Sequence, residues 1–172
     1  MVVRVDKKDL IIDGAVAIFA ESGYYKATTA QIAKAAGVTQ PYVFHFFANK
    51  EALYQAVMDR AFSRIFQVFE EIDAPPDKLY ETMGHSFIEV MKSHRDEILM
   101  LMQSHTIAEP SIREHVKAKF KLVYDTVLAR FQKAGLSDPG IKASEFIGDG
   151  MMLTLAEVLG LPELCWFNKS GK

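Results

Sequence analysis

Hydrophobic side chains recur along most of this chain at intervals of three and four residues, the spacing that lines one face of an α-helix. One long row lies between residues 50 and 72, where a helix of about 23 residues would span about 35 Å. Its members are Leu53, Val57, Ala61, Ile65 and Val68. The segments beyond it carry similar rows and no strand signal, so the pattern predicts an all-α fold.

Residues that cap or stop helices divide the chain into eight predicted helices. Glycines 23, 37, 135 and 160 are stop signals, and prolines break the chain or occupy first turns at residues 75–76, 110 and 139. The predicted helices cover about residues 9–22, 28–36, 39–47, 50–72, 77–92, 95–104, 110–134 and 139–160.

The second and third of these helices are short and close together. Thr28 and Gln31 have the spacing of a capping box, which opens the first of the pair. Gly37 ends that helix, Thr39 can cap the next, and Pro41 fits its first turn. Two helices joined by a tight glycine turn predict a helix-turn-helix, whose second helix enters the DNA major groove.

A longer stretch around this motif resembles one protein family. From Leu10 to Leu53 the chain is similar to the DNA-binding domain of the tetracycline-repressor (TetR) family of bacterial regulators. The matching residues are Ile11 to Ala15, Phe19 to Tyr24, Thr28-Thr29, Ile32-Ala33, Ala36-Gly37-Val38, Phe44 to Phe47 and Lys50 to Leu53. The resemblance implies a DNA-binding domain over residues 1–49. It also implies a helical-bundle domain over residues 50–172 for effector binding and dimerisation, with the last two long helices pairing across the dimer.

Candidate DNA contacts follow from the motif and the resemblance. Glutamine can pair bidentately with adenine, and hydroxyls at a helix start suit phosphate contacts. The candidates are Thr28, Thr29, Gln40, Pro41, Tyr42, His45 and Lys50. The sequence departs from the family at Pro41, where glycine is frequent, and at Phe44, where tyrosine is frequent.

The predicted body is rich in methionine and aromatic residues that could line an apolar effector cavity. The candidates are Met83, Phe87, Met91, Met102, His105, Phe120, Tyr124, Phe146 and Met151, with His105 and Thr154 as polar groups. The competing interpretation is an ordinary methionine-rich core.

The net charge, the cysteine content and the lengths of the apolar runs limit the classes of protein to which this chain could belong. The net charge is −2, but residues 1–50 hold six Lys/Arg against four Asp/Glu, so the head is weakly basic. Cys165 is the only cysteine, which excludes an intrachain disulfide and fits a cytoplasmic protein. No apolar run is long enough to span a membrane.

Catalytic and metal sites are not predicted. Glu81, His85 and Glu89 share one helical face, but a solvated polar stripe explains them, and no pair of Glu-x-x-His motifs occurs. No phosphate-binding loop or nucleophile signature appears, so we expect neither a cofactor nor an enzyme.

We therefore expect a homodimeric, ligand-responsive transcriptional regulator, most readily a repressor released from a palindromic operator in double-stranded DNA by a small hydrophobic effector. The alternative is a helical module that binds small molecules and acts through protein partners. A helix-bundle enzyme ranks third.

Overall fold

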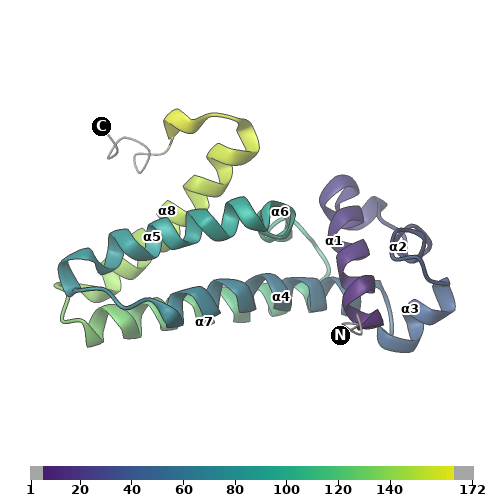
Figure 1. Cartoon of the computed structure of the whole chain (residues 1–172), viewed down its shortest axis with the longest axis horizontal. Helices are drawn as coiled ribbons and strands as arrows, with labels where there is room; N and C mark the ends of the chain where they lie inside the picture. Colours follow the sequence, from purple (N-terminus) through teal and green to yellow (C-terminus); the bar gives the residue numbers. More distant parts are fainter. Residues whose placement is uncertain (1–5, 165–172) are drawn as a thin grey trace, which may run out of the picture.

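The computed structural model describes residues 6–164, and these residues form eight α-helices and a short 3-10 helix with no strand among them (Figure 1). The helices are α1 (Lys7–Lys26), α2 (Thr29–Ala35), α3 (Gln40–Phe46), α4 (Lys50–Glu71), α5 (Pro76–Ser93), α6 (Arg95–Ser104), α7 (Pro110–Lys133) and α8 (Pro139–Leu159), followed by η1 (Pro162–Leu164). The prediction of an all-α fold is confirmed. Cys165 lies outside the described residues.

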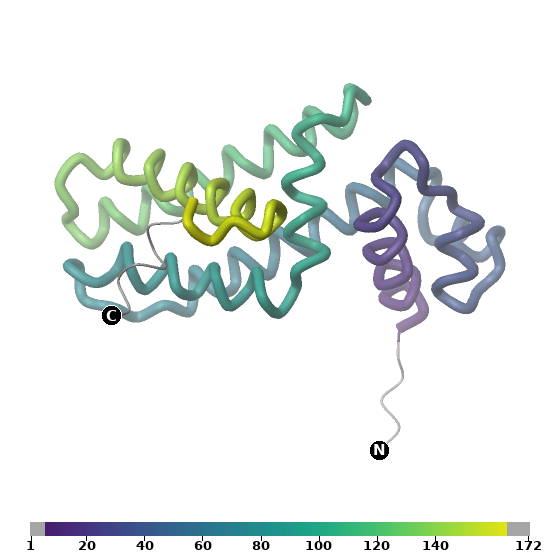
Figure 2. Tube along the Cα trace, turned by 90° about the horizontal axis from the view of Figure 1, so that it is seen from above, coloured from purple at the N-terminus to yellow at the C-terminus, as the bar shows by residue number. Residues whose placement is uncertain are grey.

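The helices form a small head and a longer body (Figures 1 and 2). Helices α1, α2 and α3 make the head, in which α1 packs against α2 and α2 against α3. Helix α4 leaves the head and runs through the body between α5 and α7, while α8 packs against α5, α6 and α7. Helix α6 crosses the body beside the head and contacts α1 directly. The head therefore touches the body through both α4 and α6.

The local signals at the helix-turn-helix are confirmed. The Thr28 hydroxyl accepts from Gln31 N at 3.2 Å, and Thr28 N donates to Gln31 Oε1 at 2.9 Å, which completes the capping box. At the end of α2, Gly37 has a φ of 66°, and Val38 N donates to Ala33 O at 2.9 Å. This geometry needs glycine, because other residues rarely adopt a positive φ.

Two helix starts differ in detail from the sequence prediction. Helix α1 begins at Lys7 rather than residue 9, because Asp6 Oδ1 accepts from Lys8 N at 2.9 Å and caps it. Thr39 occupies the N-cap position of α3, but its side chain makes no capping hydrogen bond.

The predicted cap at Asn49 is confirmed, since its Oδ1 accepts from Ala52 N at 2.8 Å.

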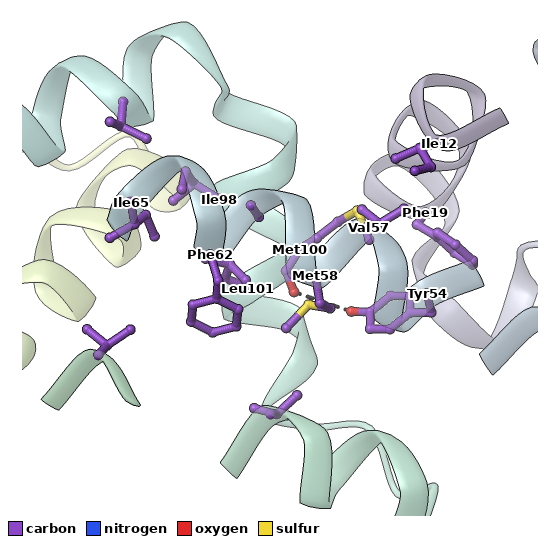
Figure 3. Close-up of a cluster of buried hydrophobic side chains, with 14 of the residues drawn as sticks. Ile12, Phe19, Tyr54, Val57, Met58, Phe62, Ile65, Ile98, Met100 and Leu101 are labelled. Carbon is purple, nitrogen blue, oxygen red and sulfur yellow. Dashed lines mark hydrogen bonds between the residues drawn. The ribbon is translucent and has the colours of Figure 1, made fainter. Parts of the chain in front are cut away.

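A buried cluster joins the head to the body (Figure 3). Phe19 of α1 is fully buried and meets the Tyr54 ring edge-on, with ring centroids 5.0 Å apart. Tyr54 is 1% exposed, and its hydroxyl donates to Met100 O of α6 at 3.3 Å. The cluster thus contains side chains from both sides of residue 50. The division into domains at that residue remains a prediction.

A charged network lies beside this cluster. Glu97 of α6 is 4% exposed and forms ion pairs with two arginines of α4, at 2.8 Å from Arg60 Nη2 and 2.9 Å from Arg64 Nε. Arg60 Nη1 also lies 2.7 Å from Asp13 Oδ1 of α1. Side chains of α1, α4 and α6 are therefore connected by charge as well as by apolar packing.

Candidate nucleic-acid interface and effector cavity

Helix α3 is held on the head by its apolar side and leaves its first turn open to solvent. Val43 is buried at 1% exposure, and Phe47 just after the helix is buried at 5%. Gln40 and Pro41 at the start of the helix are exposed. The end that carries a glutamine is therefore the accessible end, as base-edge contacts in a major groove require.

Gln40 is positioned by a partner on the neighbouring helix. Its Nε2 donates to Thr29 Oγ1 at 2.7 Å, which joins the first turn of α3 to the first turn of α2. The amide oxygen takes no part in this bond. Thr29 is half-buried and Thr28 is exposed, so the start of α2 lies at the same surface as the start of α3. These three predicted contact residues are brought together.

Tyr42 and His45 form a second group on α3. Their rings stack with centroids 6.0 Å apart, and Phe46 meets both rings edge-on. The ammonium of Lys7 lies 5.4 Å from the Tyr42 ring centroid, within the range of a cation–π contact. The sequence pattern gave no sign of this pair, because Lys7 and Tyr42 are far apart along the chain.

Lys50 has a structural role that the sequence did not reveal. Its ammonium donates to Tyr24 O at 2.9 Å and to Ala27 O at 3.2 Å, and it lies 4.4 Å from the Tyr24 ring centroid. An ammonium has three protons, so these two bonds leave one donor for a phosphate. Lys50 therefore fastens the start of α4 to the end of α1, whatever else it contacts.

The body contains a small apolar cavity that opens to solvent and has a volume of about 80 Å³. Seven of the residues proposed from the sequence line it, namely Phe87, Met102, His105, Phe120, Phe146, Met151 and Thr154. Met83 and Met91 are buried in the core, and Tyr124 is half-buried, with its hydroxyl near the start of α8. These last three residues do not line the cavity.

The sequence analysis missed the contribution of α4 to the cavity. Phe62, Ile65 and Phe69 lie along one face of that helix and line the space. Their spacing was visible in the sequence, but it indicates burial without telling a cavity wall from a filled core. Gly150 of α8 also lines the cavity, and a Cβ there would lie 3.7 Å from the Phe87 ring.

Polar groups of the cavity are few. Thr154 Oγ1 donates to Gly150 O at 2.9 Å, within α8. Tyr80 Oη donates to Asp149 Oδ2 at 2.6 Å, and Asp149 belongs to the lining. Burial and this bond raise the pKa of Tyr80, so the phenol keeps its proton. Burial lowers the pKa of His105, which favours the neutral ring.

Within residues 6–164, no group of three or more His, Cys, Asp or Glu side chains is arranged to hold a metal ion. Over the same residues, no helix has the length and hydropathy needed to cross a membrane.

Several known proteins are similar to this chain. Residues 11–57 match the family model described as bacterial regulatory proteins, tetR family. The "Fatty acid metabolism regulator protein" of Bacillus subtilis is 28% identical over 153 residues, which cover 85% of this chain and 73% of that protein. The "HTH-type transcriptional repressor AcnR" of Corynebacterium diphtheriae is 27% identical over 130 residues, covering 74% and 64%.

The fold is also similar to that of solved structures. One is the "SmeT-Triclosan complex", on which this chain superposes with a TM-score of 0.77 at 26% sequence identity. The match covers 96% of this chain and 86% of that one. The similarity therefore extends through both head and body, and is not confined to the helix-turn-helix.

Proposed function

The chain belongs to the tetR family of bacterial regulatory proteins, and we propose that it is a transcriptional repressor that a small hydrophobic effector releases from a palindromic operator. The observation that carries this proposal is the arrangement of α2 and α3. Their first turns lie at one surface, Gln40 is positioned there by Thr29, and the opposite side of α3 is buried. A DNA-bound regulator belongs in the cytoplasm, and we assign no enzymatic activity to it.

Binding to a palindrome requires a second copy of the chain, because each half-site is contacted by one recognition helix. Exposed apolar side chains lie at one position of α7 and along the length of α8, the two helices where the family resemblance places the dimer contact. They are Leu122, Ile141, Met151, Met152, Val158 and Leu159. Pairing these helices with their copies would cover such side chains and give a dimer with two heads. Two recognition helices about 34–36 Å apart would reach successive major grooves on one side of the duplex.

The route from the cavity to the head supports release by a ligand. Helix α6 supplies Met102 to the cavity, His105 lines it directly after the helix, and the same helix contacts α1 of the head. Helix α4 supplies Phe62 to the cavity and Tyr54 to the buried cluster that joins the head to the body (Figure 3). A ligand that binds more tightly to one arrangement of α4 and α6 would shift the separation of the heads.

A module that acts through protein partners is the alternative. It would use the same exposed first turns for a protein surface and would show no preference for a DNA sequence. Specific DNA binding separates the two functions.

Replacing Gln40 by alanine tests the proposed DNA contact. We expect Gln40→Ala to relax the preference for particular base pairs in each half-site, by about 1–3 kcal/mol per position. The salt dependence of binding should stay the same, because glutamine neutralises no phosphate. Fluorescence anisotropy against a set of singly substituted duplexes measures both quantities.

The matched control is Gln67→Ala, which removes an exposed glutamine of α4 whose amide donates to Glu71 in the same helix. This variant should bind every duplex as the unmodified chain does. If Gln40→Ala kept the original base preferences in full, Gln40 would not read a base edge.

A further inference from the structure

The short connection between α6 and α7 touches both the cavity and the head. It comprises residues 105–109, which lie between the two helices. His105, its first residue, lines the cavity and rests its ring against Phe120 at a centroid distance of 4.8 Å. Ile107, in the middle, is 4% exposed and belongs to the hydrophobic core. The first half of the α6–α7 connection is therefore packed into the body.

The second half of the α6–α7 connection is bonded to the head through Tyr25, near the end of α1. Ala108 N donates to Tyr25 Oη at 2.8 Å, and Tyr25 Oη donates to Glu109 Oε2 at 2.9 Å. A phenolic hydroxyl can accept and donate in this way at the same time. We call these two hydrogen bonds the Tyr25 bridge.

Tyr25 belongs to the segment that sets the position of α2. Lys50 donates to two backbone carbonyl oxygens of this segment, and α2 begins directly after it with Thr28 as its cap. Thr29, in the first turn of α2, accepts from Gln40 Nε2 of α3. A movement at the Tyr25 bridge would therefore reach the first turns of both helices of the helix-turn-helix.

The cavity is too small to bury an effector unless part of its wall moves. Its volume is about 80 Å³, whereas an apolar cavity that binds benzene in another protein has about 150 Å³. Ligand sites bury most of the surface of their ligand, so an effector of one aromatic ring or more has to displace residues of this lining. His105 is the one described lining residue that lies outside a helix. It can therefore move without the displacement of a whole helix.

We propose that the α6–α7 connection couples the cavity to the DNA-binding head. An effector that enlarges the cavity displaces His105, the displacement breaks the Tyr25 bridge, and α2 and α3 lose the position that binds the operator. Tyr25 is 59% exposed, and a hydrogen bond in contact with water contributes little net stability, so a small displacement is enough to break the bridge. The inference rests on the proposed function, because it takes the cavity as the effector site and the head as the DNA contact.

The first test removes the bridge alone. Tyr25→Phe keeps the ring and deletes the hydroxyl. We expect this variant of the full chain, with no effector added, to bind the operator about threefold to tenfold more weakly. The operator is the palindrome beside the coding region of the chain, and fluorescence anisotropy measures the affinity. The matched control is Thr106→Val, which removes a hydroxyl of the same connection that donates to Gln103 O within the body, and it should leave operator affinity unchanged.

The second test uses a side chain in place of an effector. Gly150 lines the cavity, and a Cβ there would lie in ordinary contact with the ring of Phe87, another lining residue. Gly150→Phe adds a ring that a cavity of this volume does not hold, so we expect operator binding to weaken about fivefold or more. Gly150→Ala adds one methyl group and should keep the affinity. Circular dichroism checks that each variant is folded, and Gly150→Leu replaces Gly150→Phe if the larger side chain prevents folding.

The double variant shows whether the two positions act by one route. If the cavity acts on the head through the Tyr25 bridge, Gly150→Phe will weaken operator binding less in the Tyr25→Phe background than in the unmodified chain. A purely structural role of Tyr25 would make the two losses additive. Hydrogen–deuterium exchange gives a readout without DNA. Gly150→Phe should speed exchange at the Ala108 amide, which donates to Tyr25 Oη in the unmodified chain.

The outcomes separate this inference from the proposed function. Additive losses, unchanged exchange at Ala108 in Gly150→Phe, or full operator affinity in Tyr25→Phe would each overturn the coupling through Tyr25, while a repressor with an effector cavity would stand. Equal binding of the unmodified chain to the operator and to a scrambled duplex would overturn the proposed function and this inference with it.

Discussion

Replacing Phe19 by alanine is expected to lower the free energy of unfolding by about 3–5 kcal/mol. The ring is fully buried. It meets the Tyr54 ring edge-on and stacks on the Tyr24 ring, with ring centroids 5.0 Å and 6.2 Å away. Removing it deletes buried apolar surface and leaves a cavity between the head and α4. Urea denaturation followed by circular dichroism measures the change.

The same substitution should also weaken DNA binding in the folded fraction. Phe19 supports Tyr54, which reaches α6 through its bond to Met100 O (Figure 3). Without the ring, the head is held less firmly to the body and two heads are less well oriented for one duplex. Leu10→Ala is the matched control, because Leu10 is an exposed apolar residue of the same helix. Equal stability of the two variants would show that Phe19 does not anchor the head.

Replacing Glu97 by alanine is expected to lower the free energy of unfolding by about 3 kcal/mol. Removing one member of a buried ion pair costs about 3–5 kcal/mol where the remaining charge has no other partner. The lower end applies here, because Arg60 keeps its ion pair with Asp13, and because the side chains of Arg60 and Arg64 are 21% and 36% exposed, so water can partly solvate them. Urea denaturation again measures the loss.

Glu89→Ala provides the comparison for Glu97. Glu89 forms its ion pair with Lys92 at the surface of α5, and its side chain is 70% exposed. Surface pairs contribute little, so this variant should unfold almost as the unmodified chain does. A loss at position 97 no larger than that at position 89 would mean that the network joining α1, α4 and α6 adds no stability.

Much of the fold could be predicted from the sequence because the helix ends are encoded locally. Thr28 and Gln31 bond within one turn, Gly37 adopts the positive φ that ends α2, and Asn49 caps α4. Each of these signals involves residues within a few positions of one another. The bounds of α6 agree with the prediction at both ends, since His94 precedes the helix and Ser104 ends it.

The parts that could not be predicted depend on contacts between distant residues. A glutamate in the first turn of a short helix is normally exposed, yet Glu97 is buried because Arg60 and Arg64 of another helix enclose it. The sequence indicated only a phosphate contact for Lys50. Its bonds to backbone carbonyl oxygens could not be predicted, because those oxygens belong to residues more than twenty positions earlier.

The lining of the candidate cavity also depends on contacts between distant residues, so the sequence predicts it only in part. Methionine and phenylalanine at helical spacing predict burial, and Met83 is indeed buried. The spacing cannot tell whether a buried side chain fills the core or borders an empty space. That distinction depends on how α4, α5 and α8 pack, and it separates Met83 from Phe87, which lies one turn further along α5 and lines the cavity.

The most direct measurement is the affinity of the chain for the DNA that lies beside its own coding region, by fluorescence anisotropy at two salt concentrations. We predict that a palindrome there is bound about a thousandfold or more tightly than a scrambled duplex of the same composition. We also predict that raising the salt concentration weakens the binding steeply. Equal affinity for the palindrome and the scrambled duplex at both salt concentrations would contradict the account.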